Sequence, residues 1–240
     1  MINRLSTFLY RIALTSNSKV IFENHDDRIL FLKDKLVAAD QALSVKGCGV
    51  DIINFQPIPK SSHQNTLVFI FVGRLLYDKG IIEFVAVAKK IRLLYPTVQF
   101  WVLGEIDTQN PAAIKETELQ DWITQQYIDY KGFVKDVRPY LAESDCIVLP
   151  SYREAIPRAI QEGMAMGKPA ISTDVPGCRE AIEHGKNGYL VPVQNTDILF
   201  EYVKKIIEMP TAQRIAMGEY GRQKALHELM IASSPTRYLQ

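Results

Sequence analysis

The chain has 240 residues, 47% of them hydrophobic, which is enough for one large domain or for one and a half smaller ones. Its 28 Lys and Arg residues nearly balance its 27 Asp and Glu residues, so the net charge of +1 gives no reason to expect a nucleic-acid partner. The three cysteines and four histidines are scattered without a Cys-x-x-Cys or metal-ligand spacing, which excludes a disulfide framework and a zinc site and fits a reducing cytoplasm.

The first 60 residues predict a few short elements that lead into a loop rich in Pro and polar residues. The expected elements are a helix near 4–14, a strand at 20–22, a helix near 27–37 and a strand at 42–45. Arg4 and Arg11 interrupt the apolar stretch at the start of the chain, which favours an amphipathic helix over a signal peptide. No apolar run approaches the ~18 residues of a membrane span.

From residue 67 onward, strand-like and helix-like segments alternate. Short runs with apolar character on both faces suit buried parallel strands at 67–72, 99–103, 128–130, 146–149, 170–172 and 189–191. Helical patterns lie between or after them at 81–95, 117–126, 137–142, 157–166, 179–184 and 196–207. This alternation predicts an α/β fold with a doubly wound parallel sheet, whose ligand lies beyond the carboxyl ends of the strands at the switch point.

Two cations follow the first of these strands. Arg74 comes just after the strand, and Lys79 lies in the turn that opens the next helix. An arginine fork and a lysine point charge at this edge could neutralise a diphosphate. The alternative is a solvated charged turn, in which Lys79 pairs with Asp78.

Two glutamates follow the strand at 146–149. Glu154 lies in the loop, and Glu162 lies inside the next helix, for which Pro157 suits the first position and Gly167 the residue past the end. Carboxylates beside a helix N-terminus, where strands end, can accept paired hydrogen bonds from the hydroxyls of a sugar or ribose. The alternative for Glu162 is an ordinary i,i+4 contact with Arg158, worth a few tenths of a kcal/mol.

Segment 150–162 resembles the Glu-x7-Glu motif of retaining glycosyltransferases of the GT-B fold, specifically the large family 4 group. Segments 167–180 and 187–192 also resemble that family, and the similarity runs from about residue 9 to about residue 222. The resemblance implies a Rossmann-like C-terminal half of a GT-B fold, preceded by the tail of the N-terminal half. The implied organisation is a remnant of the acceptor domain with the crossover at 1–50, a linker at 51–66, the donor-binding domain at 67–226 and a C-terminal tail at 227–240.

The family's motif also implies roles for particular residues. Arg74 and Lys79 would hold the diphosphate, Glu154 the hydroxyls of the transferred sugar, and Glu162 the ribose. The expected catalytic residues are Arg74, Lys79 and Glu154, and the expected substrate-binding residues are Gly73, Val134, Ala155, Ile156, Pro157 and Glu162. Asp174 and Arg179 are expected to be structural, through caps or ion pairs.

The resemblance implies a metal-independent glycosyltransferase without a cofactor, consistent with the lack of an Asp-x-Asp motif. The expected donor is a uridine diphosphate sugar, and the expected acceptor is a saccharide or lipid-linked saccharide in cell-surface polysaccharide or glycolipid synthesis. A cytoplasmic protein is expected, with a peripheral position at the inner face of the membrane as a further option. The alternatives are an inactive or truncated nucleotide-sugar-binding domain, one subunit of a two-chain transferase, and a GT-B sugar-nucleotide epimerase.

Because the resemblance covers only the tail of the acceptor half, we expect this chain alone to transfer no sugar. Apolar surface on segments 5–14 and 20–22 is expected to be exposed, and to lead to a homo-oligomer or a partner chain that completes the fold.

Two departures from the family's pattern lie near the site. Ala155 replaces a usual glycine, and Gly163 replaces a usual alanine and weakens its helix by roughly 1 kcal/mol.

Overall fold

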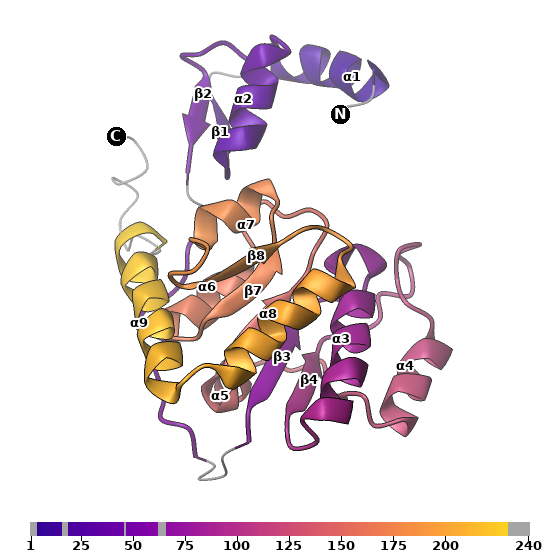
Figure 1. The fold of residues 1–240 in the computed structure, drawn as a ribbon. Helices are drawn as coiled ribbons and strands as arrows, with labels where there is room; N and C mark the ends of the chain where they lie inside the picture. The colour runs from indigo at the N-terminus through magenta and orange to yellow at the C-terminus, as the bar shows by residue number, and fades with distance from the viewer. Residues whose placement is uncertain (1–3, 16–18, 46, 62–65, 230–240) are drawn as a thin grey trace.

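The computed structural model describes residues 4–15, 19–45, 47–61 and 66–229. Its main body is a six-stranded parallel sheet in the order β5-β4-β3-β6-β7-β8 (Figure 1). The strands are β3 (Val68–Val72), β4 (Gln99–Leu103), β5 (Asp129–Gly132), β6 (Cys146–Leu149), β7 (Ala170–Thr173) and β8 (Gly188–Val191). The chain enters this sheet at β3, inside the sheet. It adds β4 and β5 on one side and then β6, β7 and β8 on the other, which is the doubly wound arrangement that the alternating sequence pattern predicted.

Helices cover both faces of the sheet, which explains why its central strands carry almost no polar residues. They are α3 (Ile81–Leu94), α4 (Glu116–Thr124), α5 (Arg138–Glu143), α6 (Arg158–Ala165), α7 (Pro176–Ala181), α8 (Thr196–Glu208) and α9 (Thr211–Glu228), with a 3-10 turn η1 at Tyr77–Lys79. Helix α3 packs beside α8, and α6 packs beside α9 (Figure 1). In the core, the rings of Phe69 and Phe100 stack at 5.4 Å between centroids, and Phe84 meets Phe100 edge-on.

A smaller unit precedes the sheet and lies next to α7 (Figure 1). It consists of α1 (Arg4–Leu14), β1 (Val20–Phe22), α2 (His25–Lys33) and β2 (Ala42–Ser44), with β1 and β2 paired in parallel. The apolar surface expected on this unit is exposed at Leu5, Phe8, Leu9, Ile12 and Ile21. Among the helices of the described ranges, none is long and apolar enough to cross a bilayer.

Several helix predictions need correction. Helix α2 begins two residues early because the Asn24 side chain accepts from the Asp27 N–H, and it stops before Lys35, whose φ is 53°. Helix α7 begins at Pro176, three residues before the predicted start, because a proline fits the first helical turn. Helix α9 was not predicted at all, and it includes residues 227 and 228 of the expected tail. Residues 230–240 of that tail lie outside the described residues.

The two glycines near α6 have clear structural roles. Gly167 follows the helix with φ 72°, the left-handed conformation expected of the residue past a helix end. A Cβ at Gly163 would overlap the side chain of Ile147 in β6. The glycine that weakens the helix locally therefore allows α6 to pack closely on the sheet.

Candidate active site

The strand order reverses between β3 and β6, and this switch point organises the site. The two strands pair in parallel, with Phe69 opposite Cys146, so the loops that follow them leave the same edge of the sheet. The backbone N–H of Tyr152 donates to the carbonyl of Asp78 at 2.8 Å, and the Ser151 hydroxyl donates to the same oxygen at 3.2 Å. These bonds join the loop after β6 to the turn after β3, where open α/β sheets bind ligands.

Lys79 and Glu154 meet across this junction. The Lys79 ammonium lies 2.7 Å from Oε1 of Glu154, and the two side chains are 23% and 11% exposed. The alternative that the sequence offered, a pair between Lys79 and its neighbour Asp78, is therefore wrong. The contact brings together a cation expected to hold a diphosphate and a carboxylate expected to hold sugar hydroxyls.

Arg74 follows β3 and forms a separate ion pair. Its Nη1 lies 3.3 Å from Oδ2 of Asp107, and its side chain is 57% exposed. Asp107 lies in the loop after β4, which is joined to the turn after β3 by the N–H of Leu75 donating to the carbonyl of Glu105 at 3.0 Å. Asp107 could not be predicted from the sequence, because a lone carboxylate in a polar loop has no informative spacing. Both predicted cations thus follow β3, but they contact different carboxylates.

Glu162 lies in α6 with its side chain only 10% exposed. Nε of Arg158 donates to Oε1 of Glu162 at 2.7 Å, so the i,i+4 contact offered as an alternative is present. Burial raises the pKa of Glu162, and the hydrogen bond and charge of Arg158 oppose that rise. The contact leaves room for a second role, since the other carboxylate oxygen can accept further hydrogen bonds.

Two adjoining cavities reach Arg74 and Glu162, whereas Lys79 and Glu154 border neither of them. One of about 690 Å³ is bordered by Gly73, Val134, Arg158 and Glu162. A smaller one of about 210 Å³ shares Gly73 and Val134 with it and reaches Arg74. The structure therefore lines one continuous region with four of the predicted site residues, beyond the carboxyl ends of β3 and β5.

The larger cavity also has polar walls that the sequence analysis did not assign. Asp51 accepts from the backbone N–H of Asn54 at 3.1 Å and from its side-chain amide at 2.6 Å, and these bonds lower the pKa of Asp51. Nη2 of Arg138 lies 2.8 Å from Oδ2 of Asp136. These groups come from the linker before the sheet, from the loop after β5 and from the start of α5, so only the folded chain places them together.

The three residues before α6 divide between surface and core. Ala155 is exposed, whereas Ile156 and Pro157 are buried, so a ligand would meet the last two through their backbone. The helix begins at Arg158, which corrects the expectation that Pro157 is its first residue. A Cβ at Gly177 in α7 would overlap the carbonyl of Ala155. This close approach fixes the loop that carries Glu154.

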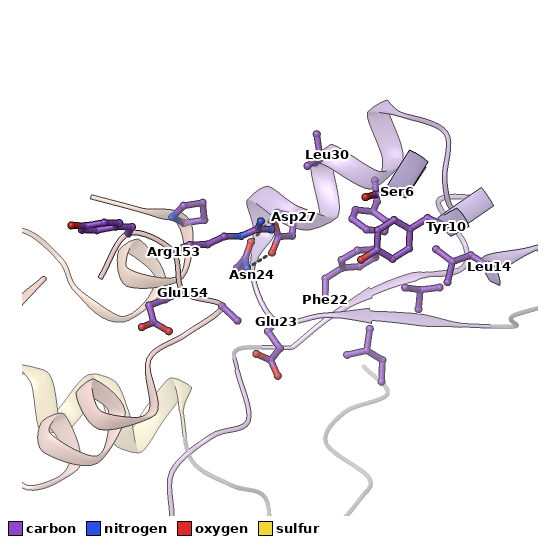
Figure 2. A pocket seen from close by; sticks show the side chains of 16 residues that line it. Ser6, Tyr10, Leu14, Phe22, Glu23, Asn24, Asp27, Leu30, Arg153 and Glu154 are labelled. Atoms are coloured by element: carbon purple, nitrogen blue, oxygen red, sulfur yellow. Dashed lines mark hydrogen bonds and ion pairs between the residues drawn. The ribbon is translucent and has the colours of Figure 1, made fainter. Parts of the chain in front are cut away.

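A third cavity, of about 950 Å³, lies between the loop after β6 and the N-terminal unit (Figure 2). Its wall includes Glu154 on one side and Glu23 and Asn24 on the other. Arg153 extends toward α2, with Nη2 3.8 Å from Oδ1 of Asp27 (Figure 2). Aromatic side chains also line this space, namely Tyr10, Phe22, Phe31 and Tyr152. The combination offers hydrogen bonds and apolar ring faces to a polar ligand.

Asp174 and Arg179 form ion pairs, as the sequence analysis expected. Nε of Arg179 lies 2.6 Å from Oδ1 of Asp174, and its Nη1 lies 3.1 Å from Oδ2 of Asp26. Nearby, the N–H of His25 donates to Oε1 of Glu180 at 3.2 Å. These contacts hold α2 against α7, which is a structural role.

The doubly wound sheet and its helices have the architecture of a GT-B glycosyltransferase. Among solved structures, the chain is similar to Anabaena HepE in complex with UDP, with a TM-score of 0.80 and 21% identity over 95% of this chain and 65% of that one. It is also similar to sucrose-phosphate synthase from Thermosynechococcus elongatus, with a TM-score of 0.78 and 22% identity over 95% of this chain and 58% of that one. Residues 66–209 match the family model of glycosyl transferases group 1, and the chain belongs to this family.

Curated relatives extend over most of the chain. A Campylobacter jejuni enzyme, N,N'-diacetylbacillosaminyl-diphospho-undecaprenol alpha-1,3-N-acetylgalactosaminyltransferase, is 26% identical over 97% of this chain and 62% of its own length. An Escherichia coli enzyme, UDP-Gal:alpha-D-GlcNAc-diphosphoundecaprenol alpha-1,3-galactosyltransferase, is 25% identical over 82% of this chain and 53% of its own length. The chain thus spans about half to three fifths of the length of these relatives.

Proposed function

We propose that this chain binds the donor of a retaining glycosyltransferase, a nucleoside diphosphate sugar, at the switch point between β3 and β6. The observation that carries the proposal is the meeting of Lys79 and Glu154 at 2.7 Å, where the loop after β6 is joined to the turn after β3. Membership of the glycosyl transferases group 1 family supports this use of the site. A uridine diphosphate sugar is the proposed donor, because the Escherichia coli relative is named for UDP-Gal.

In the proposed reaction, an acceptor hydroxyl oxygen bonds to the sugar as the bond between the sugar and the diphosphate breaks, and the hydroxyl proton leaves with the diphosphate. Negative charge develops on the phosphate oxygens as that bond breaks. Arg74 and Lys79 would stabilise that charge, and preorganised cations are effective because they need not reorganise as the bond breaks. Glu154 would hold the hydroxyls of the transferred sugar, and Glu162 those of the ribose. We propose that Arg74 and Lys79 compensate this charge without a metal ion.

We also propose that the cavity of about 950 Å³ receives the acceptor, a saccharide or a lipid-linked saccharide. Glu154 borders this cavity and also contacts Lys79, so it stands where a donor sugar and an acceptor would meet. Both relatives are named for acceptors linked through diphosphate to undecaprenol, which supports a lipid-linked acceptor. Such an acceptor would place the protein at the cytoplasmic face of a membrane, in polysaccharide or glycolipid synthesis.

The test is calorimetric binding of a panel of nucleoside diphosphate sugars to the full chain, followed by assays with labelled donors, in which we expect this chain alone to transfer no sugar. We expect a uridine diphosphate sugar to bind, and Lys79→Ala to weaken binding by ~1.5–3 kcal/mol, as for a hydrogen bond to a charged group. Lys90→Ala is the matched control, since Lys90 is also paired at 2.7 Å, with Asp197. Failure of every donor to bind, or equal losses in both variants, would overturn the proposal.

A further inference from the structure

The Lys79–Glu154 pair is held in place from both sides. The bonds from Ser151 and Tyr152 to the carbonyl of Asp78 tie the two loops together next to the pair. Helix α7 packs with Gly177 against the backbone carbonyls of Glu154 and Ala155. A side chain at position 177 would overlap these carbonyls. The backbone on both sides of the ion pair is therefore fixed, which keeps Lys79 and Glu154 within reach of each other.

Lys79 and Glu154 are each other's partner when no donor is bound. In the proposed function, Lys79 holds the diphosphate and Glu154 holds the sugar. A nucleotide sugar offers new partners to both, since its phosphate can accept from Lys79 and its hydroxyls can donate to Glu154. A bare nucleoside diphosphate offers a partner only to Lys79, and it leaves the nearby carboxylate to repel the phosphate.

We infer that Glu154 competes with the diphosphate for Lys79, so that the site favours a nucleotide sugar over the bare nucleoside diphosphate. Glu154 is then a specificity-determining residue as well as a sugar contact. After transfer, the product nucleoside diphosphate no longer carries the sugar that occupied Glu154. Renewed pairing of Glu154 with Lys79 favours release of that product. This inference rests on the proposed function of the site.

The test compares UDP with UDP-sugars on the full chain and on Glu154→Gln, which keeps the side-chain shape and removes the charge. Binding of bare UDP should become roughly tenfold tighter in the variant, because Lys79 is freed for the phosphate. Binding of the preferred UDP-sugar should stay the same or weaken, so the preference for the sugar-bearing nucleotide should fall. Asp197→Asn, which frees Lys90 from an ion pair of the same length, should leave UDP affinity unchanged.

The outcomes separate the inference from the proposed function. If the parent binds UDP and Lys79→Ala weakens it, but Glu154→Gln binds UDP equally or less tightly, the competition is refuted and the donor site stands. If the parent binds neither UDP nor any UDP-sugar, the proposed function fails and the inference fails with it. Should Glu154→Gln fold poorly, Glu154→Asp supplies the second test, because its shorter carboxylate reaches Lys79 less well and should tighten UDP binding. Unchanged or weaker binding by that variant would also refute the competition.

Discussion

Replacing Glu162 by glutamine should change stability and binding in opposite directions. The Glu162 side chain is 10% exposed, whereas its partner Arg158 is 76% exposed. Folding therefore removes much of the water around the Glu162 carboxylate. The Arg158 guanidinium, whose positive charge offsets that of the carboxylate, remains largely in solvent. The raised pKa of Glu162 reports that the charged form is disfavoured by folding.

The direction of the pH effect on stability follows from the linkage between proton binding and folding. A carboxyl group whose pKa is higher in the folded state binds its proton more tightly there, so the protonated form favours folding. This contribution is complete below the unfolded pKa of about 4.3 and is lost as the pH rises through the folded pKa. The uncharged Glu162→Gln variant should therefore gain stability relative to the parent as the pH increases.

The change in stability expected for Glu162→Gln combines two effects. The variant loses an i,i+4 pair worth ~0.3–0.5 kcal/mol, and it no longer buries a charge. Replacement of buried ion pairs is often neutral or stabilising by ~1–4 kcal/mol, and we expect the low end here because Arg158 is exposed. A gain of ~1 kcal/mol corresponds to ~2–4 °C in Tm for a chain of this size. The lost ribose contact should weaken UDP binding by ~1.5–3 kcal/mol.

Scanning calorimetry at pH 4.5 and pH 8, with isothermal titration of UDP, measures both effects. The matched control is Glu219→Gln, since Glu219 is an exposed helical glutamate that accepts a hydrogen bond from Gln223, four residues later. It should change neither stability nor UDP binding appreciably. A Glu162→Gln variant that is less stable than the parent at pH 8 would refute the burial argument. One that binds UDP like the parent would remove Glu162 from the ribose site.

Four further variants test other parts of the site and fold. Arg74→Ala should weaken UDP binding by ~2 kcal/mol, whereas Asp107→Asn, which frees Arg74, should not weaken it; equal affinity of Arg74→Ala and the parent would exclude Arg74 from the donor site. Gly177→Ala should lower both Tm and UDP affinity, because the added methyl group displaces the loop after β6, and an unchanged Tm would show that the loop yields easily. The pKa of Glu183 is lowered to about 2, first by its hydrogen bond from Lys186. The charged Glu183 should stabilise the fold above its unfolded pKa, and this contribution is lost as the pH falls through about 2. Glu183→Gln should therefore lower Tm at pH 7 but not at pH 2. Equal Tm values of parent and variant at pH 7 would contradict this.

The sequence predicted the sheet well because its strands are buried on both faces. Runs such as Val68–Val72 and Cys146–Leu149 have no polar side chain, and loops with Gly, Pro or charged residues bound them. Their alternation with helices was enough for the fold class. The motif resemblance then singled out Lys79 and Glu154 separately. Their direct contact depends on the pairing of two strands that are distant in the sequence, which no local pattern contains.

Helix α9 shows why one element escaped prediction. Its buried face includes Gly218, Gly221 and Ala225, which let the helix approach its neighbours closely. Periodicity analysis looks for large apolar residues at helical spacing, and small residues give little signal. Asp107 escaped for a related reason, since its significance comes only from its distance to Arg74 in the folded chain.

Hydrogen–deuterium exchange of the full chain with and without saturating UDP tests the central claim most directly, because it locates the bound nucleotide without a variant. The proposed site predicts slower exchange on UDP binding in three segments, 73–80, 132–138 and 153–162, which carry the predicted cations, the loop after β5 and the two glutamates. Little change is expected in α8 and α9, because none of their residues borders the cavities of about 690, 210 and 950 Å³. Protection confined to those helices, or no protection anywhere at a UDP concentration shown to bind, would contradict a donor site at the switch point.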